Sequence, residues 1–150
     1  MRENTGLFKA KRINNGKWVQ GYYWTNELGN HFIKVVRDEN NNFVKNPTEN
    51  DYEIDPETLC ECTGLKDKNG KLIWENDIVT ADYYPFKDYG KLNYVGIITF
   101  FEDCAQFGII LKCVNKDKRG VSDGINKEIT EEDEFEVIDN KFDNPELMGR

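Results

Sequence analysis

The residue types in this 150-residue chain that could perform chemistry are four cysteines, one histidine and 28 carboxylates. The cysteines form two pairs along the chain, Cys60 with Cys62 and Cys104 with Cys113. One residue separates the first pair and eight residues separate the second, whereas structural zinc sites space their paired thiolates two to four residues apart. The spacing therefore favours buried, apolar thiols, and we expect no metal site.

A nucleophilic centre would have to use His31, because it is the only histidine in the chain. A Cys–His pair would need His31 to meet Cys104 or Cys113 across the fold, and the single serine, Ser122, lies in a charged segment. A lone histidine at the end of a strand is more typical of a surface or packing residue. The sequence also contains no glycine-rich phosphate-binding motif. We therefore expect neither nucleophilic catalysis nor a bound cofactor.

The carboxylates are plentiful, but their arrangement does not select a reaction. Paired acids can hydrolyse glycosides, yet counting carboxylates does not identify a pair. The acidic run at residues 131–134 lacks the alternating oxygen ligands and the central glycine of a calcium loop, which favours a solvated turn. An enzyme with paired carboxylates is therefore the least favoured class, and we expect no catalytic residue.

Four aromatic residues near the amino terminus are the candidate partner-contact residues: Trp18, Tyr22, Tyr23 and Trp24. In a strand, the period of two places Trp18, Tyr22 and Trp24 on one face together with Gln20. Tyr and Trp anchor protein interfaces, and beside a lysine they can also stack on the bases of single-stranded nucleic acid. The alternative is that Trp18, Tyr22 and Trp24 line the core and that Tyr23 is partly exposed.

The net charge of −8 is unevenly distributed. Residues 1–40 hold seven Lys/Arg against four Asp/Glu, whereas residues 41–150 hold thirteen against twenty-four. Binding to duplex DNA depends on neutralising phosphates with Lys and Arg, so this charge disfavours double-stranded DNA. The longest apolar stretch, residues 94–101, is far shorter than the ~20 residues of a membrane-spanning helix, and residues 1–13 lack the apolar segment of a signal peptide. We expect a cytoplasmic protein without a membrane partner.

Short apolar runs interrupted by Gly, Asn and Asp predict strands joined by tight turns. Asn15-Gly16 and Asn69-Gly70 predict two such turns. Single helical turns are expected at residues 55–58 and 144–147, where Asp or Asn precedes proline. Strands are expected at residues 7–13, 17–24, 32–36, 52–54, 58–63, 78–81, 94–101, 107–114 and 135–138. The first three form a meander, and the polar residues 38–51 form a loop at a subdomain boundary.

Residues 63–73 (TGLKDKNGKLI) and 74–79 (WENDIV) resemble the YopX family of phage and prophage proteins. The likeness includes KWV and GYY at residues 17–23, DPET at 55–58, FEVI at 135–138 and DNPEL at 143–147. It covers nearly the whole chain and is weakest at residues 38–51 and 84–93. Two departures are visible. Asn76 stands where the family has Gly, which is compatible because Asn also accepts a positive φ, and Glu61 stands where Gln is common, between two cysteines that are not typical of the family.

The resemblance implies a mainly β fold with few short helical turns, in a single domain over residues 1–150. An N-terminal β-meander would occupy residues 1–62, and a small SH3-like β-barrel would occupy residues 63–150. The family has no established biochemical role.

Three functional classes remain open. The first is a non-catalytic phage or prophage accessory protein, a protein-binding or assembly module whose partner is a host protein, a phage protein or a second copy of the chain. The second is a nucleic-acid-related protein, which would contact single strands through the basic N-terminal meander or mimic nucleic acid through the acidic residues 127–139. The third is the carboxylate enzyme.

Overall fold

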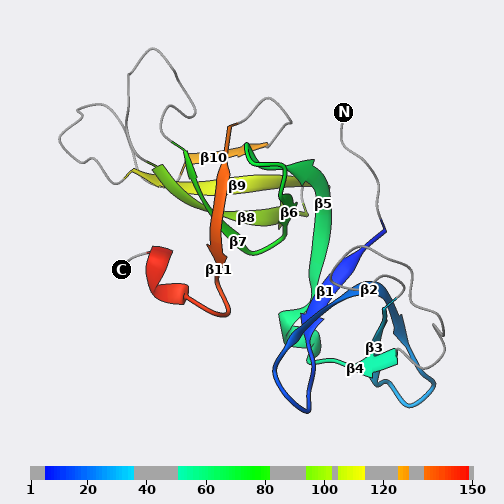
Figure 1. Ribbon diagram of the computed structural model, residues 1–150. Helices are drawn as coiled ribbons and strands as arrows, with labels where there is room; N and C mark the ends of the chain where they lie inside the picture. The colour runs from blue at the N-terminus through cyan, green and yellow to red at the C-terminus, as the bar shows by residue number, and fades with distance from the viewer. Residues whose placement is uncertain are drawn as a thin grey trace. The chain divides into compact units, whose positions relative to one another are not determined.

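The computed structural model describes residues 6–35, 51–81, 94–102, 105–113, 125–128 and 134–148 (Figure 1). Two 3₁₀ turns are found there, η2 (Pro56–Thr58) and η4 (Pro145–Met148). The strands are β1 (Phe8–Lys11), β2 (Trp18–Thr25), β3 (His31–Lys34), β4 (Asp51–Glu53), β5 (Cys60–Lys66), β6 (Leu72–Trp74), β7 (Asp77–Ala81), β8 (Tyr94–Phe101), β9 (Gln106–Cys113), β10 (Ile125–Glu128) and β11 (Glu136–Asn140). The mainly β fold predicted from the sequence is confirmed.

The strands form two antiparallel sheets. One sheet has the strand order β4-β3-β2-β1-β5-β6, and the other has the order β10-β9-β8-β7-β11. The chain divides between Cys62 and Thr63 into two compact units, called here the N-terminal unit and the C-terminal unit. The first three residues of β5 belong to the N-terminal unit and its last four to the C-terminal unit.

The N-terminal unit is a meander in which each strand pairs with the next. β1 pairs with β2, β2 with β3 and β3 with β4, all antiparallel (Figure 1). The predicted meander is therefore confirmed and gains β4 as a fourth strand. Its core consists of Ala10, Ile33 and Ile54, and the partly buried side chains that pack against it are Phe8, Val19, Tyr23, Val35 and Leu59.

The two predicted proline-linked helical turns, η2 and η4, are both present. Asp55 caps η2, because its Oδ1 accepts a hydrogen bond from the Glu57 N–H at an N-to-O distance of 3.0 Å. This satisfies one of the N–H groups that the start of a helical turn leaves without a backbone partner. A local signal of two or three residues was sufficient here, since the cap and the proline act within one turn.

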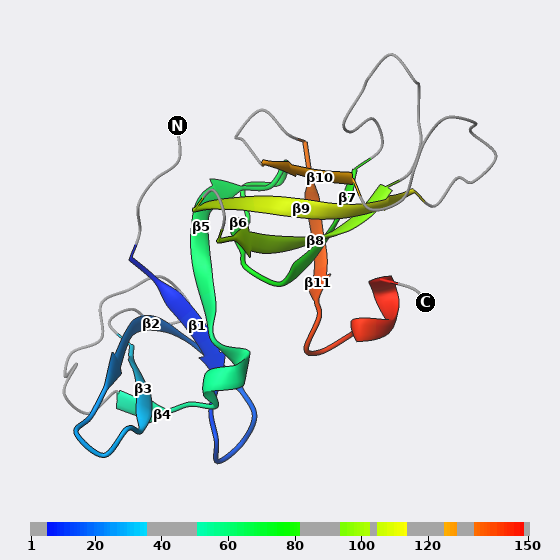
Figure 2. The ribbon, with the colours of Figure 1, turned by 180° about the vertical axis from the view of Figure 1, so that it is seen from behind.

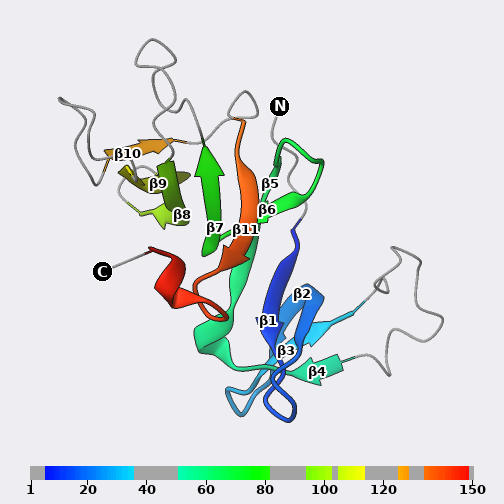
Figure 3. The same cartoon turned by 60° about the vertical axis from the view of Figure 1, so that its left-hand side comes forward.

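The C-terminal unit centres on β7, β8 and β9. β8 and β9 pair along their full length, from Tyr94↔Cys113 to Phe101↔Gln106 (Figure 2). β7 lies between β8 and β11 (Figure 3). The buried apolar residues of this unit that the structure describes are Leu65, Ile73, Trp74, Ile78, Val79, Ile98, Phe107, Ile109 and Phe135. The nearly continuous apolar runs of β8 and β9 had predicted this pair of adjacent strands.

The SH3-like barrel is not confirmed. Among the described residues, the sheet of the C-terminal unit has β10 and β11 at its two ends and does not close. β6 and β10 were not predicted, because three or four residues give too little periodicity to recognise. The loops expected at residues 83–89 and 116–124 lie outside the described residues, as does the loop at 38–51 apart from Asp51, which begins β4.

The turn between β6 and β7 explains the departure at Asn76. Asn76 has a φ of 71°, the left-handed conformation in which Asn is among the few tolerated non-glycine residues. Its N–H donates to the Ile98 carbonyl oxygen at 2.8 Å, and its carbonyl oxygen accepts from the Lys141 N–H at 3.0 Å. The prediction that Asn serves at this glycine position through a positive φ is confirmed.

Replacing Asn76 with Ala is expected to lower the free energy of unfolding by about 1 kcal/mol, because a Cβ without a polar group is disfavoured at positive φ. Asn76→Gly, the matched variant, should be at least as stable as Asn76→Ala, because glycine has no Cβ to be strained at this positive φ and both variants keep the two backbone hydrogen bonds. Urea unfolding of the two variants checks this order, and an Ala variant more stable than the Gly variant would contradict it.

Candidate functional site

The two faces of β2 differ sharply in their surroundings. Val19 and Tyr23 pack against the core of the N-terminal unit. The residues that alternate with them lie on the opposite face, where Tyr22 is 49% exposed and Trp24 is 38% exposed. The prediction that one face carries Trp18, Tyr22 and Trp24 agrees with this alternation, but the expectation that this face lines the core is wrong.

The buried face of β2 is the opposite of the one expected, and the reason is physical. A period of two determines which side chains share a face but not which face the rest of the chain covers. Tyr23 is partly exposed, as the core-lining alternative also states, and it packs against Phe8 with ring centroids 5.6 Å apart. The large aromatic side chains of Tyr22 and Trp24 are left on the surface. Their size alone would instead suggest burial.

His31 accompanies Tyr23 at the edge of the core. The Tyr23 hydroxyl and His31 Nδ1 are hydrogen-bonded at 2.6 Å. The two rings are stacked, with centroids 5.8 Å apart and planes 7° from parallel. Both residues are half-buried. His31 is thus a packing residue, as its isolation in the sequence indicates, and Tyr23 is the inward-facing member of the four candidate residues.

Tyr23→Phe is expected to lower the free energy of unfolding by about 1 kcal/mol, because it removes the hydrogen bond to His31 and keeps the ring. Thermal unfolding measures this change. The variant should bind any partner of the opposite face as tightly as the wild type does. A loss of binding without a loss of stability would instead place Tyr23 in the contact surface.

Trp24 is fixed in place by residues of two other strands, β3 and β4. Its ring stacks on Phe32 of β3, with centroids 4.5 Å apart and planes 18° from parallel. Its Nε1–H donates to Oδ1 of Asp51 in β4 at 2.9 Å. The other oxygen, Oδ2, accepts from the Lys34 ammonium at 2.9 Å. The exposed indole therefore has a defined orientation before any partner arrives.

Trp18 lies at the other end of this face, next to two lysines of β1. The Lys9 ammonium lies 4.8 Å and the Lys11 ammonium 5.5 Å from the centroid of its ring. Lys11 is directly opposite Trp18 in the β1–β2 register. Such cation–π contacts contribute about 0.5–1 kcal/mol each at exposed sites. We call the surface formed by Trp18, Tyr22, Trp24, Phe32, Lys9 and Lys11 the aromatic face.

The turn between β2 and β3 presents a further apolar side chain. Leu28 is 85% exposed. Asn26 holds this turn in shape, because its Oδ1 accepts from the Leu28 N–H at 3.1 Å and from the Asn30 N–H at 2.9 Å. Leu28 was not predicted as a contact residue, and the available signal in the sequence was an isolated leucine between Asn26 and Asn30 in a tight turn.

The thiols and acids form no chemical centre in the part of the chain that the structure describes. Cys60 and Cys62 are buried thiols that form no disulfide, and the Cys60 thiol donates to the Thr58 carbonyl oxygen at an S-to-O distance of 3.3 Å. Cys104 and the side chain of Cys113 lie outside the described residues. Within those residues, no group of three or more His, Cys, Asp or Glu side chains could hold a metal ion.

Asp67, in the C-terminal unit, has a carboxyl group with a perturbed pKa. Burial alone would raise its pKa, but the backbone N–H groups of Val137, Lys71 and Asn69, together with the Lys71 ammonium, lower the pKa below its ordinary 3.8. Strongly shifted acids often mark catalytic sites. Here backbone donors occupy both oxygens, so the carboxylate has a structural role.

The comparisons with known proteins agree with the sequence resemblance. The family model described as YopX protein matches residues 7–149, which is nearly the whole chain. None of the curated proteins matches it. Among the described residues, no helix is long and apolar enough to cross a membrane. The chain belongs to the YopX family.

Proposed function

We propose that this protein is a non-catalytic binding module that contacts another protein through the aromatic face of its N-terminal unit. The observation that carries the proposal is the exposure of Tyr22 and Trp24 on a strand whose other face is packed against the core. Tyr and Trp are enriched at the energetically dominant positions of protein interfaces. Leu28 extends the apolar surface at the adjoining turn.

The rigidity of the face supports this role. Trp24 is already held by the Phe32 ring and the Asp51 carboxylate. A partner that covers it therefore immobilises little additional side-chain freedom, which makes a preorganised aromatic contact more favourable than a mobile one. The Asn26 side chain similarly fixes the turn that carries Leu28.

Charge on neighbouring strands favours a protein over nucleic acid. Asp51 and Glu53 of β4 lie opposite Lys34 and Phe32 in the β3–β4 register, so their carboxylates lie on the side of the sheet that carries the aromatic face. The Lys34 charge is already paired with Asp51. A phosphate backbone crossing this face would meet carboxylates as well as lysines, which weakens the electrostatic term of nucleic-acid binding.

The resemblance to phage and prophage proteins extends the proposal to where the protein acts and on what. The module would act as an accessory protein in the cytoplasm of the host cell, on a host or phage protein or on a second copy of itself. The SH3-like character expected for residues 63–150 is retained as part of this proposal. The molecular mass in solution, compared between the wild type and Trp24→Ala, tests whether the partner is a second copy of the chain.

A photocrosslinking experiment tests the contact surface directly. The photoreactive residue p-benzoylphenylalanine is placed at Tyr22 in one protein and at Leu147 in another. Leu147 is an exposed apolar residue of η4 in the C-terminal unit, which makes it a matched control. Irradiation in the natural host should yield a discrete adduct from position 22 that position 147 does not yield. Identical adducts from both positions, or none from position 22, would contradict the proposal.

Trp24→Ala is expected to weaken binding to the partner identified in this way by about 2 kcal/mol, or roughly thirty-fold in Kd. Truncating a central aromatic side chain typically costs this much binding free energy at an interface. Titration calorimetry with the purified partner measures the change. Leu147→Ala is the control and should bind within about twofold of the wild type, an effect well below 1 kcal/mol. Equal losses in both variants would place the contact elsewhere.

Single-stranded nucleic acid is the second candidate, and Trp18 favours it. The two lysine ammonium groups beside its ring combine a stacking surface with positive charge, as in single-strand-binding proteins. Binding would quench tryptophan fluorescence and weaken steeply as salt is added. A titration with a thymidine oligonucleotide in low salt tests this. An unchanged fluorescence spectrum and no mobility shift would reject it.

A further inference from the structure

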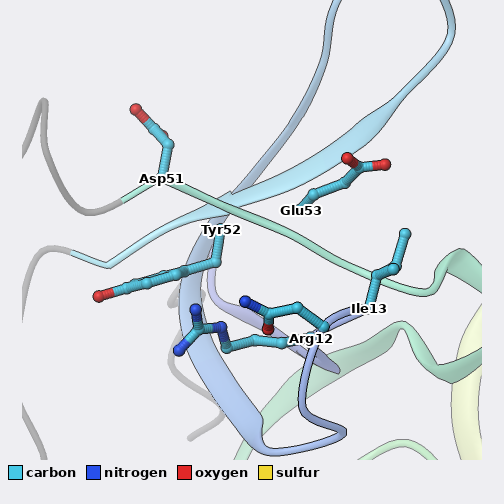
Figure 4. A pocket seen from close by; sticks show the side chains of 6 residues that line it. Arg12, Ile13, Asp51, Tyr52 and Glu53 are labelled. Carbon is cyan, nitrogen blue, oxygen red and sulfur yellow. The ribbon is translucent and has the colours of Figure 1, made fainter.

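A pocket of about 280 Å³ lies in the N-terminal unit where the end of β1 meets the edge strand β4. An isolated bridge joins Arg12 to Ile54, and the Ile13 N–H donates to the Glu53 carbonyl oxygen at 3.1 Å. These backbone contacts hold the pocket walls together. The pocket is lined by Arg12, Ile13, Asn14, Asp51, Tyr52 and Glu53 (Figure 4).

The Arg12 side chain is held by Tyr52. The guanidinium carbon lies 4.2 Å from the centroid of the Tyr52 ring, and Figure 4 shows the two side chains alongside each other. Stacking uses the flat face of a guanidinium and leaves its edge, with the N–H donors, available. Among the described residues, none accepts a hydrogen bond from the Arg12 side chain. A half-buried, oriented set of donors therefore faces the pocket, with no acceptor in the part of the chain that the structure describes.

The two acids of β4 do not neutralise Arg12. Successive side chains of a strand point to opposite faces, and Figure 4 shows Asp51 and Glu53 on one side of β4 with Tyr52 and Arg12 on the other. Asp51 is already bonded to the Trp24 indole and the Lys34 ammonium. Glu53 forms no ion pair with Arg12.

We propose that this pocket binds a single carboxylate group, which the edge of the Arg12 guanidinium grips through two parallel hydrogen bonds. The planar fork of arginine matches the geometry of a carboxylate. The Asn14 amide, which also lines the pocket, supplies further N–H donors. Phosphate accepts the same paired hydrogen bonds, and its higher charge strengthens both the attraction by Arg12 and the repulsion by Glu53, so phosphate is the competing ligand in the test below. The site goes beyond the proposed function, because its proposed binding groups, Arg12 and Asn14, are not part of the aromatic face.

Nuclear magnetic resonance of the arginine Nε–H group tests the site in the full-length protein. The probes are N-acetylglutamic acid amide, which offers a side-chain carboxylate, N-acetylalanine, which offers a chain-terminal carboxylate, and inorganic phosphate. A saturable shift of the Arg12 signal with either carboxylate at millimolar concentration is expected. The probe that binds more tightly shows whether the natural ligand offers a side-chain or a chain-terminal carboxylate. No saturable shift at tens of millimolar, or tighter binding of phosphate at pH 7, would overturn the proposal.

Variants make the assignment specific. Arg12→Gln should abolish the saturation, and Arg12→Lys should weaken it by roughly tenfold, because lysine keeps the charge but loses the fork. With these variants, binding is followed through the backbone amide signals of Asn14 and Glu53. Lys17→Gln removes an exposed cation of the same hairpin outside the pocket and should bind normally. Equal binding by Arg12→Gln and the wild type would refute the proposal. Tyr22→Ala should leave this site intact, so the outcome is independent of the aromatic face.

Discussion

Replacing Gly21 with alanine is expected to lower the free energy of unfolding of the N-terminal unit by about 3 kcal/mol or more. A Cβ on Gly21 would lie 2.0 Å from the Lys34 carbonyl oxygen, 2.8 Å from the Lys34 carbonyl carbon and 3.1 Å from the Val35 Cα. All three are backbone atoms, so no side-chain rotation relieves the overlap. Overpacking typically costs about 1–3 kcal/mol and more when the backbone must move.

The measurement is urea unfolding followed by tryptophan fluorescence, since two of the three tryptophans, Trp18 and Trp24, lie in this unit. Gly16→Ala is the control. Gly16 has nothing within 4 Å of an added Cβ and a φ of +69°, so its variant should lose only about 1 kcal/mol from the strained backbone. The prediction fails if Gly21→Ala is as stable as Gly16→Ala.

Replacing Asp67 with alanine is expected to destabilise the C-terminal unit by about 3 kcal/mol. Asp67 is buried. Its Oδ1 accepts from the Asn69 and Lys71 N–H groups, both at 2.9 Å, and its Oδ2 accepts from the Val137 N–H at 3.0 Å. One carboxylate thus joins the turn after β5 to β11. Hydrogen bonds to charged groups contribute about 1.5–3 kcal/mol each, and removing the acceptor leaves its donors unsatisfied.

Asp67→Asn provides the pH test. The folded pKa of Asp67 lies below the ordinary 3.8, so its ionised form stabilises the fold. That contribution is complete above the unfolded pKa and is lost as the pH falls through the lower, folded value. The difference in unfolding free energy between the wild type and Asp67→Asn should therefore shrink as the pH drops below about 4.

The control for this test is Glu136→Gln. Glu136 pairs with Lys68 at 3.4 Å, and both side chains are more than two-fifths exposed. An exposed ion pair contributes about 0–1 kcal/mol, so this variant should remain close to the wild type at neutral pH. A stability gap for Asp67→Asn that stays constant from pH 7 to pH 2 would show that its charge contributes nothing.

Sequence patterns predicted much of the N-terminal unit because its strands pair with their sequence neighbours. The Asn15-Gly16 turn joins β1 to β2, and the meander follows from turns of this kind. The conformation of Asn76 was equally local, since it depends on the residue type at a single position in a turn. The partner-contact role of Trp18, Tyr22, Tyr23 and Trp24 stays a prediction, now divided between three outward residues and the inward Tyr23.

The candidate sites were less accessible to sequence reasoning. Arg12 gave no signal, because its meaning comes from Tyr52, which lies forty residues further along the chain. Asp67 gave no signal either, because its hydrogen bond to Val137 spans 70 residues. Contacts of this separation depend on the completed fold.

The amino-acid order by itself determined the strand periodicity, the two proline-linked turns and the family, because each of these depends on residue type within a few positions. Only the tertiary structure decided that Val19 and Tyr23 face the core while Tyr22 and Trp24 face outward. A strand has two chemically plausible faces, and the segment that packs across one of them selects the buried side. At β2, this segment is the backbone of Lys34 and Val35, which passes so close to Gly21 that no side chain fits there.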